Sequence, residues 1–216
     1  MGKIDQGILG GFSGKVGPVV GYIRKGYAGM RAYRRHRGPS TIEQQRIQLR
    51  FLELTKLANP FAPAYRTGLY KTAKGKDVSD YNVFIEKNFA AVSATPGLTT
   101  TVDFSKMVLA EGKLPPVLFA RPDLTTPQTV SATFQPMLEV EETTSQDQVY
   151  LFVYCPSLEM GVMSAPAERS TGHVSATVPA AWNGLEVHVW GFVMGNAPIN
   201  MGMPSKSTYL GSGEIG

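Results

Sequence analysis

The region of the sequence best suited to chemistry is a basic cluster near the amino terminus, interleaved with tyrosines. Arginine side chains bind phosphate or carboxylate groups bidentately, and tyrosine rings are surfaces on which bases stack. The cluster therefore predicts contact with nucleic acid, contact with the acidic part of a neighbouring subunit, or a solvated surface. Its basic residues are Arg24, Lys25, Arg31, Arg34, Arg35 and Arg37, and its tyrosines are Tyr22, Tyr27 and Tyr33.

A glycine-rich motif just before this cluster has some features of a phosphate-binding loop. Residues 10–16 read GGFSGKV. The spacing does not fit such a loop, because Leu9 stands where the first glycine belongs. Val16 also replaces the Ser or Thr that would hold magnesium. We therefore do not expect nucleotide binding at this motif.

The other residues that could act as catalysts or metal ligands are isolated along the chain. His36, His173 and His188 are far apart, and none has ligand spacing with Cys155. Cys155 ends an apolar run, so we interpret it as a small buried side chain. Residues 139–142 (EVEE) are typical of a solvated strand end. Because no nucleophile with its base and oxyanion donors is visible, we expect no catalytic residue, metal, cofactor or small-molecule substrate.

The formal net charge of +4 conceals two regions of opposite sign. Residues 1–76 contain 15 Lys and Arg against 3 Asp and Glu, whereas residues 77–216 contain 6 against 14. Opposite charges favour contact between the two regions, within one subunit or between neighbours. No stretch approaches the roughly 18 apolar residues of a membrane span, and the amino terminus lacks the apolar segment of a signal peptide. We expect synthesis in the cytoplasm without a signal peptide, and no membrane span.

Glycines recur at almost every third or fourth position from residue 7 to residue 29, with single apolar residues between them. Such a segment loses much backbone entropy on ordering and has few side chains to bury in return. It can order against another surface, because glycine permits close approach of two backbones. Two interpretations stay open: an arm that docks on a neighbouring subunit, and a poorly ordered terminus or glycine-rich hairpin on its own domain. The residues proposed for the assembly arm are Gly10, Gly11, Phe12, Ser13, Gly14, Val16, Gly17, Val20 and Gly21.

Helical patterns follow the basic cluster. Residues 40–58 predict the clearest helix, which a Ser or Thr can cap and an Asn-Pro pair ends. A second, shorter helix is predicted over residues 79–89, and residues 70–76 between the two are expected to form a basic loop. One face of the first helix is expected to be buried through a stripe formed by Ile47, Phe51, Leu54, Leu57 and Ala58.

After about residue 98 the apolar pattern alternates, as expected of β-strands. Residues 130–134 and 185–189 alternate cleanly, while residues 149–154 are nearly continuously apolar, as in a central strand covered on both faces. Short strands separated by turn signals predict an antiparallel β-sandwich of immunoglobulin-like or fibronectin-like type. The expected fold is α+β and mainly β, with a glycine-rich basic arm (1–39), a helical segment (40–97) and a β-sandwich domain (98–216).

The chain contains the specific motif GGFSGKVG at residues 10–17, and further motifs YNVF (81–84), GKLP (112–115), VPAAW (178–182) and STYLG (207–211). Together these resemble an uncharacterised Bacteroidota family, a domain of unknown function whose members are similar in length to this chain. The resemblance covers most of the chain and implies neither an activity nor functional residues. The basic segment, the Gln- and Arg-rich helix and the Tyr-Asn-x-Phe pattern also have a looser likeness to phage structural proteins.

These observations favour a non-enzymatic structural protein that self-associates, such as a component of a virion or phage-like particle. The expected partners are copies of this chain and other structural proteins of a particle. The alternative is a nucleic-acid-binding module that uses the basic amino-terminal region.

Overall fold

The computed structural model describes residues 3–4, 11–24, 26–33, 38–76, 78–138 and 143–216. The chain divides into two compact units, which we call unit 1 (Met1–Glu43) and unit 2 (Gln44–Gly216). Among the described residues the protein is mainly β, with antiparallel sheets and four α-helices, in agreement with the expected class. None of the helices in these residues is long and apolar enough to cross a membrane.

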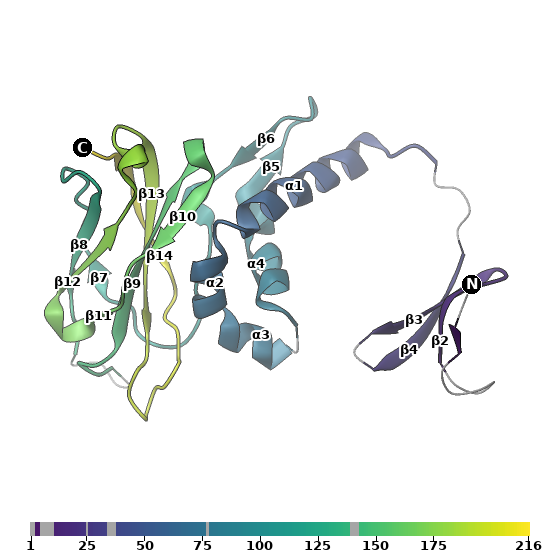
Figure 1. Ribbon diagram of the computed structural model, residues 1–216, viewed down its shortest axis with the longest axis horizontal. Coiled ribbons are helices and arrows are strands. Elements are labelled where there is room, and N and C mark those ends of the chain that lie inside the picture. Colours follow the sequence, from purple (N-terminus) through teal and green to yellow (C-terminus); the bar gives the residue numbers. More distant parts are fainter. Residues whose placement is uncertain (1–2, 5–10, 25, 34–37, 77, 139–142) are drawn as a thin grey trace. The chain divides into compact units, whose positions relative to one another are not determined.

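Unit 1 contains one antiparallel sheet in which the strands follow each other in chain order (Figure 1). Its strands are β1 (Lys3–Ile4), β2 (Phe12–Val16), β3 (Val19–Arg24) and β4 (Tyr27–Ala32).

Unit 2 begins within α1 (Ile42–Ala58), which is followed by α2 (Ala62–Gly68), α3 (Tyr70–Lys76) and α4 (Asp80–Asn88). The predictions of helices over residues 40–58 and 79–89 are confirmed, and the side chain of Ser79 caps α4 by accepting a hydrogen bond from the Asn82 amide. The prediction of a basic loop over residues 70–76 is wrong, because these residues form α3. This helix is held by Ala73, which is buried in the core, while its lysines are exposed.

The strands of unit 2 form two larger sheets and one hairpin, all antiparallel. The five-stranded sheet has the order β10-β9-β13-β14, with β11 also paired to β9, and the three-stranded sheet has the order β12-β8-β7. The bounds are β5 (Val92–Ala94), β6 (Thr100–Val102), β7 (Leu118–Phe119), β8 (Thr129–Gln135), β9 (Gln148–Cys155), β10 (Met160–Met163), β11 (Ala167–Glu168), β12 (His173–Thr177), β13 (Glu186–Met194) and β14 (Thr208–Glu214).

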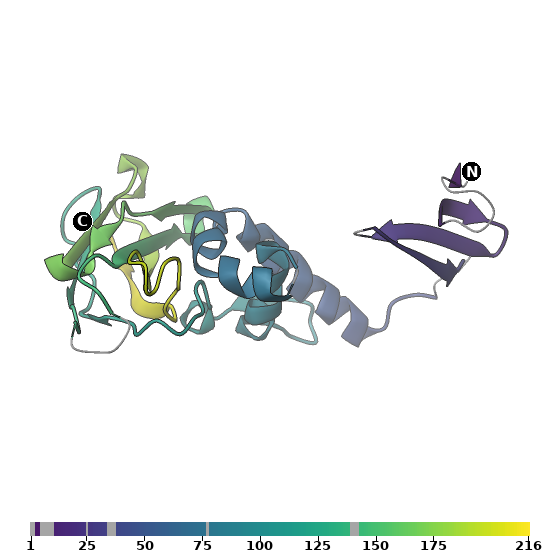
Figure 2. The ribbon, with the colours of Figure 1, turned by 90° about the horizontal axis from the view of Figure 1, so that it is seen from below.

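Strand β9 is buried on both faces, as the apolar run over residues 149–154 predicts. Successive side chains of a strand point to opposite faces. Leu151 and Val153 accordingly enter a core shared with the three-stranded sheet, whereas Phe152 and Tyr154 enter a second core shared with the helices. Figures 1 and 2 show the helices α2 and α4 beside the five-stranded sheet. Unit 2 is therefore built in three layers, with the five-stranded sheet in the middle.

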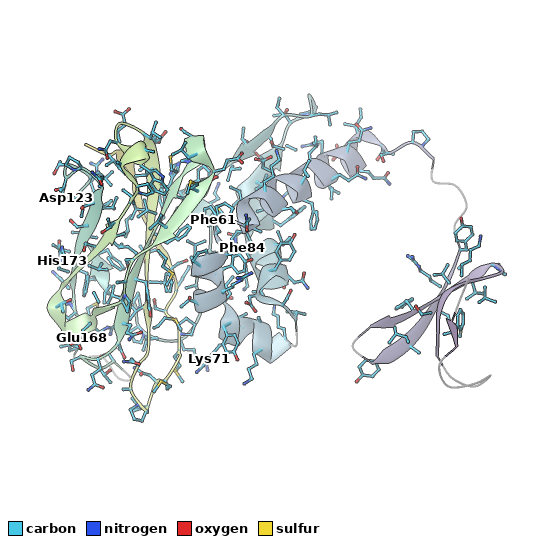
Figure 3. The ribbon with its side chains drawn as sticks, in the orientation of Figure 1. Phe61, Lys71, Phe84, Asp123, Glu168 and His173 are labelled. Atoms are coloured by element: carbon cyan, nitrogen blue, oxygen red, sulfur yellow. The ribbon has the colours of Figure 1, made fainter. Side chains whose placement is uncertain are left out.

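Phe61, between α1 and α2, joins the helices to this middle sheet (Figure 3). Its ring centroid lies 4.9 Å from that of Phe152, 4.7 Å from that of Tyr154 and 5.5 Å from that of Trp190. Phe84 of α4 lies 5.9 Å away on the helical side. Aromatic contacts of this kind add to the large apolar area that each ring buries.

The apolar stripe predicted on α1 is buried only in its second half. Leu54, Leu57 and Ala58 are buried, but Ile47 and Phe51 are 53% and 49% exposed, so the expected burial of these two residues is wrong. The reason is that the first half of α1 is attached to the hairpin β5–β6 through arginine side chains instead of apolar ones.

Candidate assembly interface

Most of the predicted assembly arm lies in a glycine-rich β-meander. Gly11 lies directly before β2, and the residues from Phe12 to Gly21 occupy β2, the following turn and the first half of β3. Gly10 lies outside the described residues. Val16 pairs with Val19 across a two-residue turn, in which Gly17 has a φ of 57° and Pro18 follows. Glycine first in a two-residue hairpin loop is the pattern of a type II′ turn. Within the described residues, the glycine-rich segment is thus paired with itself as a hairpin.

Two further glycines make room for aromatic rings that lie across the sheet. A Cβ atom added at Gly21 would lie 2.2 Å from the carbonyl oxygen of Phe12 and 2.5 Å from its ring. One added at Gly29 would lie 2.5 Å from the ring of Tyr22, which is the direct cross-strand neighbour of Gly29. Aromatic rings that cover strand glycines stabilise sheets that otherwise have few side chains.

The backbone register separates the side chains of this meander by type. Directly paired residues share a face, and neighbours along one strand point to opposite faces. Gly14 pairs with Gly21, and Gly21 pairs with Met30, so these positions define one face. The side chains that the register assigns to this face are all apolar, and we call them the apolar sheet face: Phe12, Val16, Val19, Ile23, Ala28, Met30 and Ala32.

The apolar sheet face has no second layer among the described residues of unit 1. Val16 is 51% exposed, Ile23 is 49% exposed and Met30 is 70% exposed. Among residues 12–23 and 27–32 of this sheet, only Gly21 is buried. An isolated two-stranded hairpin is marginally stable in water, and three or more strands with a hydrophobic face are the minimum for independent stability. Within the described part of unit 1 the apolar sheet face is thus uncovered.

The opposite face of the same sheet is basic and aromatic. Lys15, Tyr22, Tyr27 and Arg31 share it by register, and the Lys15 ammonium lies 3.8 Å from the centroid of the Tyr33 ring. We call these five residues the basic sheet face. The predicted contact residue Arg24 lies in β3 opposite Tyr27, while Lys25, Arg34, Arg35 and Arg37 lie outside the described residues. The structure therefore places part of the predicted cluster on one surface.

The predicted assembly arm contains residues of both faces of the sheet. Val20 and Ser13 belong to the basic side of the sheet, whereas Phe12 and Val16 belong to the apolar side. The separation was hidden in the sequence because glycines occupy positions where alternation would otherwise be visible. Met30 in β4 is 70% exposed on the apolar face and was not predicted as a functional residue.

Unit 2 contains a cavity of about 500 Å³ between the hairpin β5–β6 and the five-stranded sheet. His188 lies in its wall, with Nδ1 2.8 Å from the hydroxyl of Tyr209 and the ring 4.2 Å from that of Phe104. Burial lowers the pKa of His188, so its imidazole is neutral at pH 7. The hydrogen bond from Lys106 lowers the pKa of the Asp103 carboxyl at the rim. These groups can hold a polar molecule, but the partner of His188 is a phenol and not an alcohol or thiol nucleophile.

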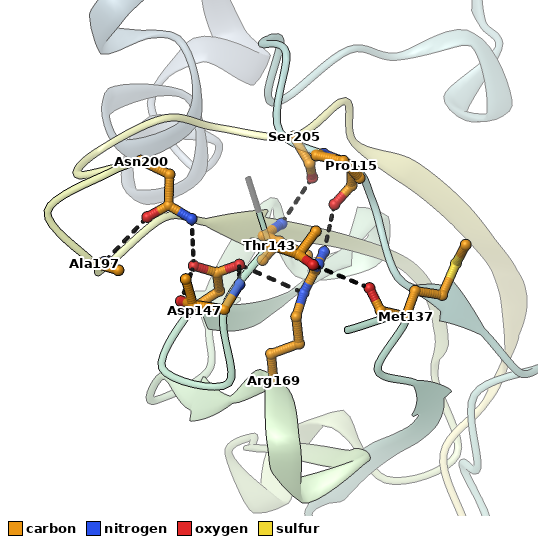
Figure 4. Close-up of polar contacts among 10 residues, drawn as sticks. Pro115, Met137, Thr143, Asp147, Arg169, Ala197, Asn200 and Ser205 are labelled. Atoms are coloured by element: carbon orange, nitrogen blue, oxygen red, sulfur yellow. Dashed lines mark hydrogen bonds and ion pairs between the residues drawn. The ribbon is translucent and has the colours of Figure 1, made fainter. Parts of the chain in front are cut away.

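A buried polar network fastens the loops at one end of unit 2 (Figure 4). The Asp147 carboxylate accepts hydrogen bonds from the Thr144 hydroxyl at 2.8 Å and from the Asn200 amide at 2.7 Å. Arg169 Nε lies 3.7 Å from this carboxylate, and Arg169 also donates to the carbonyl of Pro115. Asp147, Arg169 and Asn200 are completely buried. No sequence signal pointed to this network, because its members are in separate loops far apart in the chain.

The candidates for other chemistry remain separate in space. Cys155 is buried in the core at the end of β9, which confirms the prediction of a buried side chain. Over the described stretches of the chain, no three His, Cys, Asp or Glu side chains are grouped closely enough to hold a metal ion.

The sheet of unit 1 and the layers of unit 2 both fall within one recognised protein family. A family model described as a family of unknown function (DUF6266) matches residues 11–211. The chain belongs to this family. The prediction that the chain belongs to a family of unknown function is thereby confirmed. Neither curated proteins nor solved structures gave a match.

The extent of the DUF6266 match bears on the role of unit 1. The match begins at Gly11, directly before β2, and ends at Gly211 in β14. It therefore includes the whole β2–β4 meander as well as nearly all of unit 2. In this DUF6266 protein the glycine-rich sheet is part of the family domain and not an unrelated extension.

Proposed function

We propose that this DUF6266 protein is a non-enzymatic structural protein that assembles with copies of itself through the apolar sheet face. The observation that carries the proposal is a sheet with one entirely apolar, half-exposed face and no second layer in its own unit. The loose likeness of the sequence to phage structural proteins suggests a repetitive particle, such as a virion, as the setting.

The two units differ in the sign of their charge, which is compatible with contact between two copies. Residues 1–43 contain 8 Lys and Arg against 2 Asp and Glu, whereas residues 44–216 contain 13 against 15. Unit 1 of one copy is therefore attracted to unit 2 of another at long range. The apolar sheet face itself carries no charge, so burying it incurs no desolvation of ionised groups.

The apolar area is large enough to matter for association. Complete burial of a Val, Ile or Met side chain contributes about 1.5–3 kcal/mol. Covering the exposed halves of Val16, Ile23 and Met30 therefore contributes roughly 3 kcal/mol for each face. Association also costs translational and rotational freedom. Self-assembly consequently needs both this face and a complementary apolar surface on the partner.

A matched pair of substitutions in β4 tests the proposal. Met30→Glu places a charge on the apolar sheet face, while Tyr27→Glu places the same charge on the basic sheet face, where the tyrosine is 81% exposed. We expect Met30→Glu to reduce the molar mass measured by light scattering to that of a monomer, and Tyr27→Glu to leave the assembly intact. A wild-type protein that is monomeric at all accessible concentrations would rule out the proposal.

The basic sheet face supports a second candidate function, the binding of single-stranded nucleic acid. Tyr22, Tyr27 and Tyr33 alternate with Lys15 and Arg31 on one surface, and exposed rings among cations are a sequence-tolerant platform for stacked bases. We expect affinity for a labelled oligonucleotide that falls steeply with salt. Tyr27→Ala and Arg31→Ala should weaken it, whereas Met30→Glu should not. No anisotropy change with wild type at low salt would exclude this function.

We also infer that the two sheets of unit 2 form an immunoglobulin-like sandwich. The support is the strand order: β7, β8 and β12 correspond to strands A, B and E, and β10, β9, β13 and β14 correspond to C′, C, F and G. Such sandwiches occur in many proteins that act by binding, so this assignment is consistent with assembly but does not itself establish it. An experimental structure with a different strand order would contradict the assignment.

A further inference from the structure

The cavity between the hairpin β5–β6 and the five-stranded sheet is lined by three separate parts of unit 2. The hairpin contributes Ser93 and Thr101, the short helical turn after β6 contributes Phe104–Lys106, and the sheet contributes His188 and Tyr209. Its volume of about 500 Å³ lies within the range of roughly 300–1,000 Å³ that is usual for small-molecule sites. The cavity therefore has room for a small ligand.

The turn at the rim of this cavity is held in place by its own hydrogen bonds. The Asp103 amide donates to the carbonyl of Ala91 at 2.8 Å. The Asp103 carboxylate accepts from the amide of Ser105 at 3.2 Å and from the hydroxyl of Ser105 at 2.5 Å. The ring of Phe104 lies 4.2 Å from that of His188 in the sheet. Because these groups are already ordered, a ligand would lose little free energy in ordering them.

The charges in the cavity lining balance each other. Asp103 and Lys106 are the two charged side chains among the described lining residues, and they form an ion pair of 2.6 Å. His188 is neutral at pH 7, since burial lowers its pKa. Sites for phosphate or carboxylate ligands contain cationic groups that pair with the ligand instead. The balance of charge therefore favours an uncharged ligand.

The polar groups of the lining are mainly hydroxyls. The hydroxyl oxygens of Ser93 and Thr101 lie 2.6 Å apart, so one of their two protons is shared between them and the other is left to donate. The Tyr209 hydroxyl lies 2.8 Å from Nδ1 of His188. Each hydroxyl both donates and accepts hydrogen bonds, and the Lys106 ammonium has further protons to donate. Donors and acceptors thus share one cavity, as a ligand that itself carries hydroxyls requires.

The remaining lining is apolar and comes from Phe104, Val102 and the alanines at 90 and 91. A sugar ring combines both properties, because its hydroxyls lie around its edge and its C–H groups lie on its faces. We propose that this cavity binds an uncharged sugar ring, either as a free monosaccharide or as the end unit of a glycan. The inference goes beyond the proposed function and does not depend on it, since the cavity lies within unit 2.

A matched pair of double variants tests the proposal. Ser93→Ala with Thr101→Val removes the hydroxyl pair that lines the cavity. Thr95→Val with Thr99→Val removes the next hydroxyl pair of the same hairpin, which is also 2.6 Å apart but does not line the cavity. Saturation-transfer difference NMR on the full chain measures binding of glucose, galactose, mannose and N-acetylglucosamine. Glucuronic acid and a hexose phosphate are the charged counterparts.

We expect at least one uncharged sugar to bind wild type with a Kd on the order of 1 mM, and the charged sugars to bind more weakly. The cavity variant should raise this Kd about tenfold, because two hydrogen-bonding groups are lost, and the hairpin control should bind like wild type. Met30→Glu should also bind like wild type, whatever its effect on assembly. A methyl glycoside that binds as tightly as the free sugar indicates the end unit of a glycan, whereas loss of binding indicates a free monosaccharide; either result supports the proposal.

Other outcomes overturn it. The proposal fails if wild type gives no saturation transfer with any uncharged sugar, or if a charged sugar binds in preference. It also fails if the cavity variant binds as tightly as wild type, or if the hairpin control loses binding equally. Circular dichroism checks that each variant is folded, and Tyr209→Phe, which removes a single hydroxyl, replaces the cavity variant if the latter is not.

Discussion

The substitution Gly21→Ala probes whether the β2–β4 meander depends on close packing between its own strands. The new Cβ atom would lie 2.2 Å from the carbonyl oxygen of Phe12, which belongs to the backbone and cannot move by a rotamer change. Strands β2 and β3 must therefore shift apart locally. Overpacking of this kind costs about 1–3 kcal/mol, and weakening a backbone hydrogen bond between the strands adds about 0.5–1.5 kcal/mol.

A loss of this size is large for a small sheet without a second layer in its own unit, because three or more strands with a hydrophobic face are the minimum for independent stability. A cost of about 2 kcal/mol changes the ratio of paired to unpaired meander by a factor of roughly 30. Unit 2 has separate cores and should keep its unfolding transition. We therefore expect Gly21→Ala to remove amide protection from residues 11–33 and to abolish assembly without lowering the melting temperature of unit 2.

Hydrogen–deuterium exchange with peptide resolution measures this effect directly. Gly29→Ala is the control, because the obstacle there is the end of the half-exposed Tyr22 side chain, which can swing away. We expect its cost to stay under about 1 kcal/mol. Unchanged protection of residues 11–33 in Gly21→Ala, or an equal loss in both variants, would refute the reasoning.

Three further predictions concern unit 2. Phe61→Ala should lower the free energy of unfolding by about 3–5 kcal/mol in a urea titration, because it leaves a cavity between the helices and the middle sheet; a loss below about 1 kcal/mol would contradict the packing described. Arg169→Met should cost about 3–5 kcal/mol, because Asp147 remains buried without its ion-pair partner, and thermal unfolding measures it. Burial lowers the pKa of His188 below its usual 6.5, so the unfolded chain binds a proton first as the pH falls. The contribution of His188 to stability is thus complete above the unfolded pKa and declines as the pH falls toward the lowered folded pKa. When melting temperature is plotted against pH, the curves of wild type and His188→Phe should differ in slope only between these two pKa values.

Features governed by local pattern could be predicted from the sequence. The helix expected over residues 40–58 is found as Ile42–Ala58, and that expected over 79–89 is found as Asp80–Asn88. The apolar run over residues 149–154 and the alternation over 130–134 lie within β9 and β8. Each signal depends on residues close together in the chain, namely a cap, a period or a turn pair.

Features governed by distant contacts could not be predicted in the same way. The short helices α2 and α3 lack a long periodic pattern, and packing against α4 and the middle sheet decides their structure. The exposure of Ile47 depends on two arginines that reach the carbonyls of β5, which the spacing of apolar residues does not reveal. The two faces of the glycine-rich meander likewise emerge only from the pairing of β2, β3 and β4.

The middle sheet of unit 2 has a consequence for how this chain can vary. In β9 the rings of Phe152 and Tyr154 fill the helical side, while the smaller Leu151 and Val153 fill the other side. Deleting one residue from this strand would exchange the two sets and force aromatic rings into spaces shaped for aliphatic ones. Insertions and deletions should therefore be confined to the connecting loops, and the strand should change by substitutions that preserve the size of each side chain.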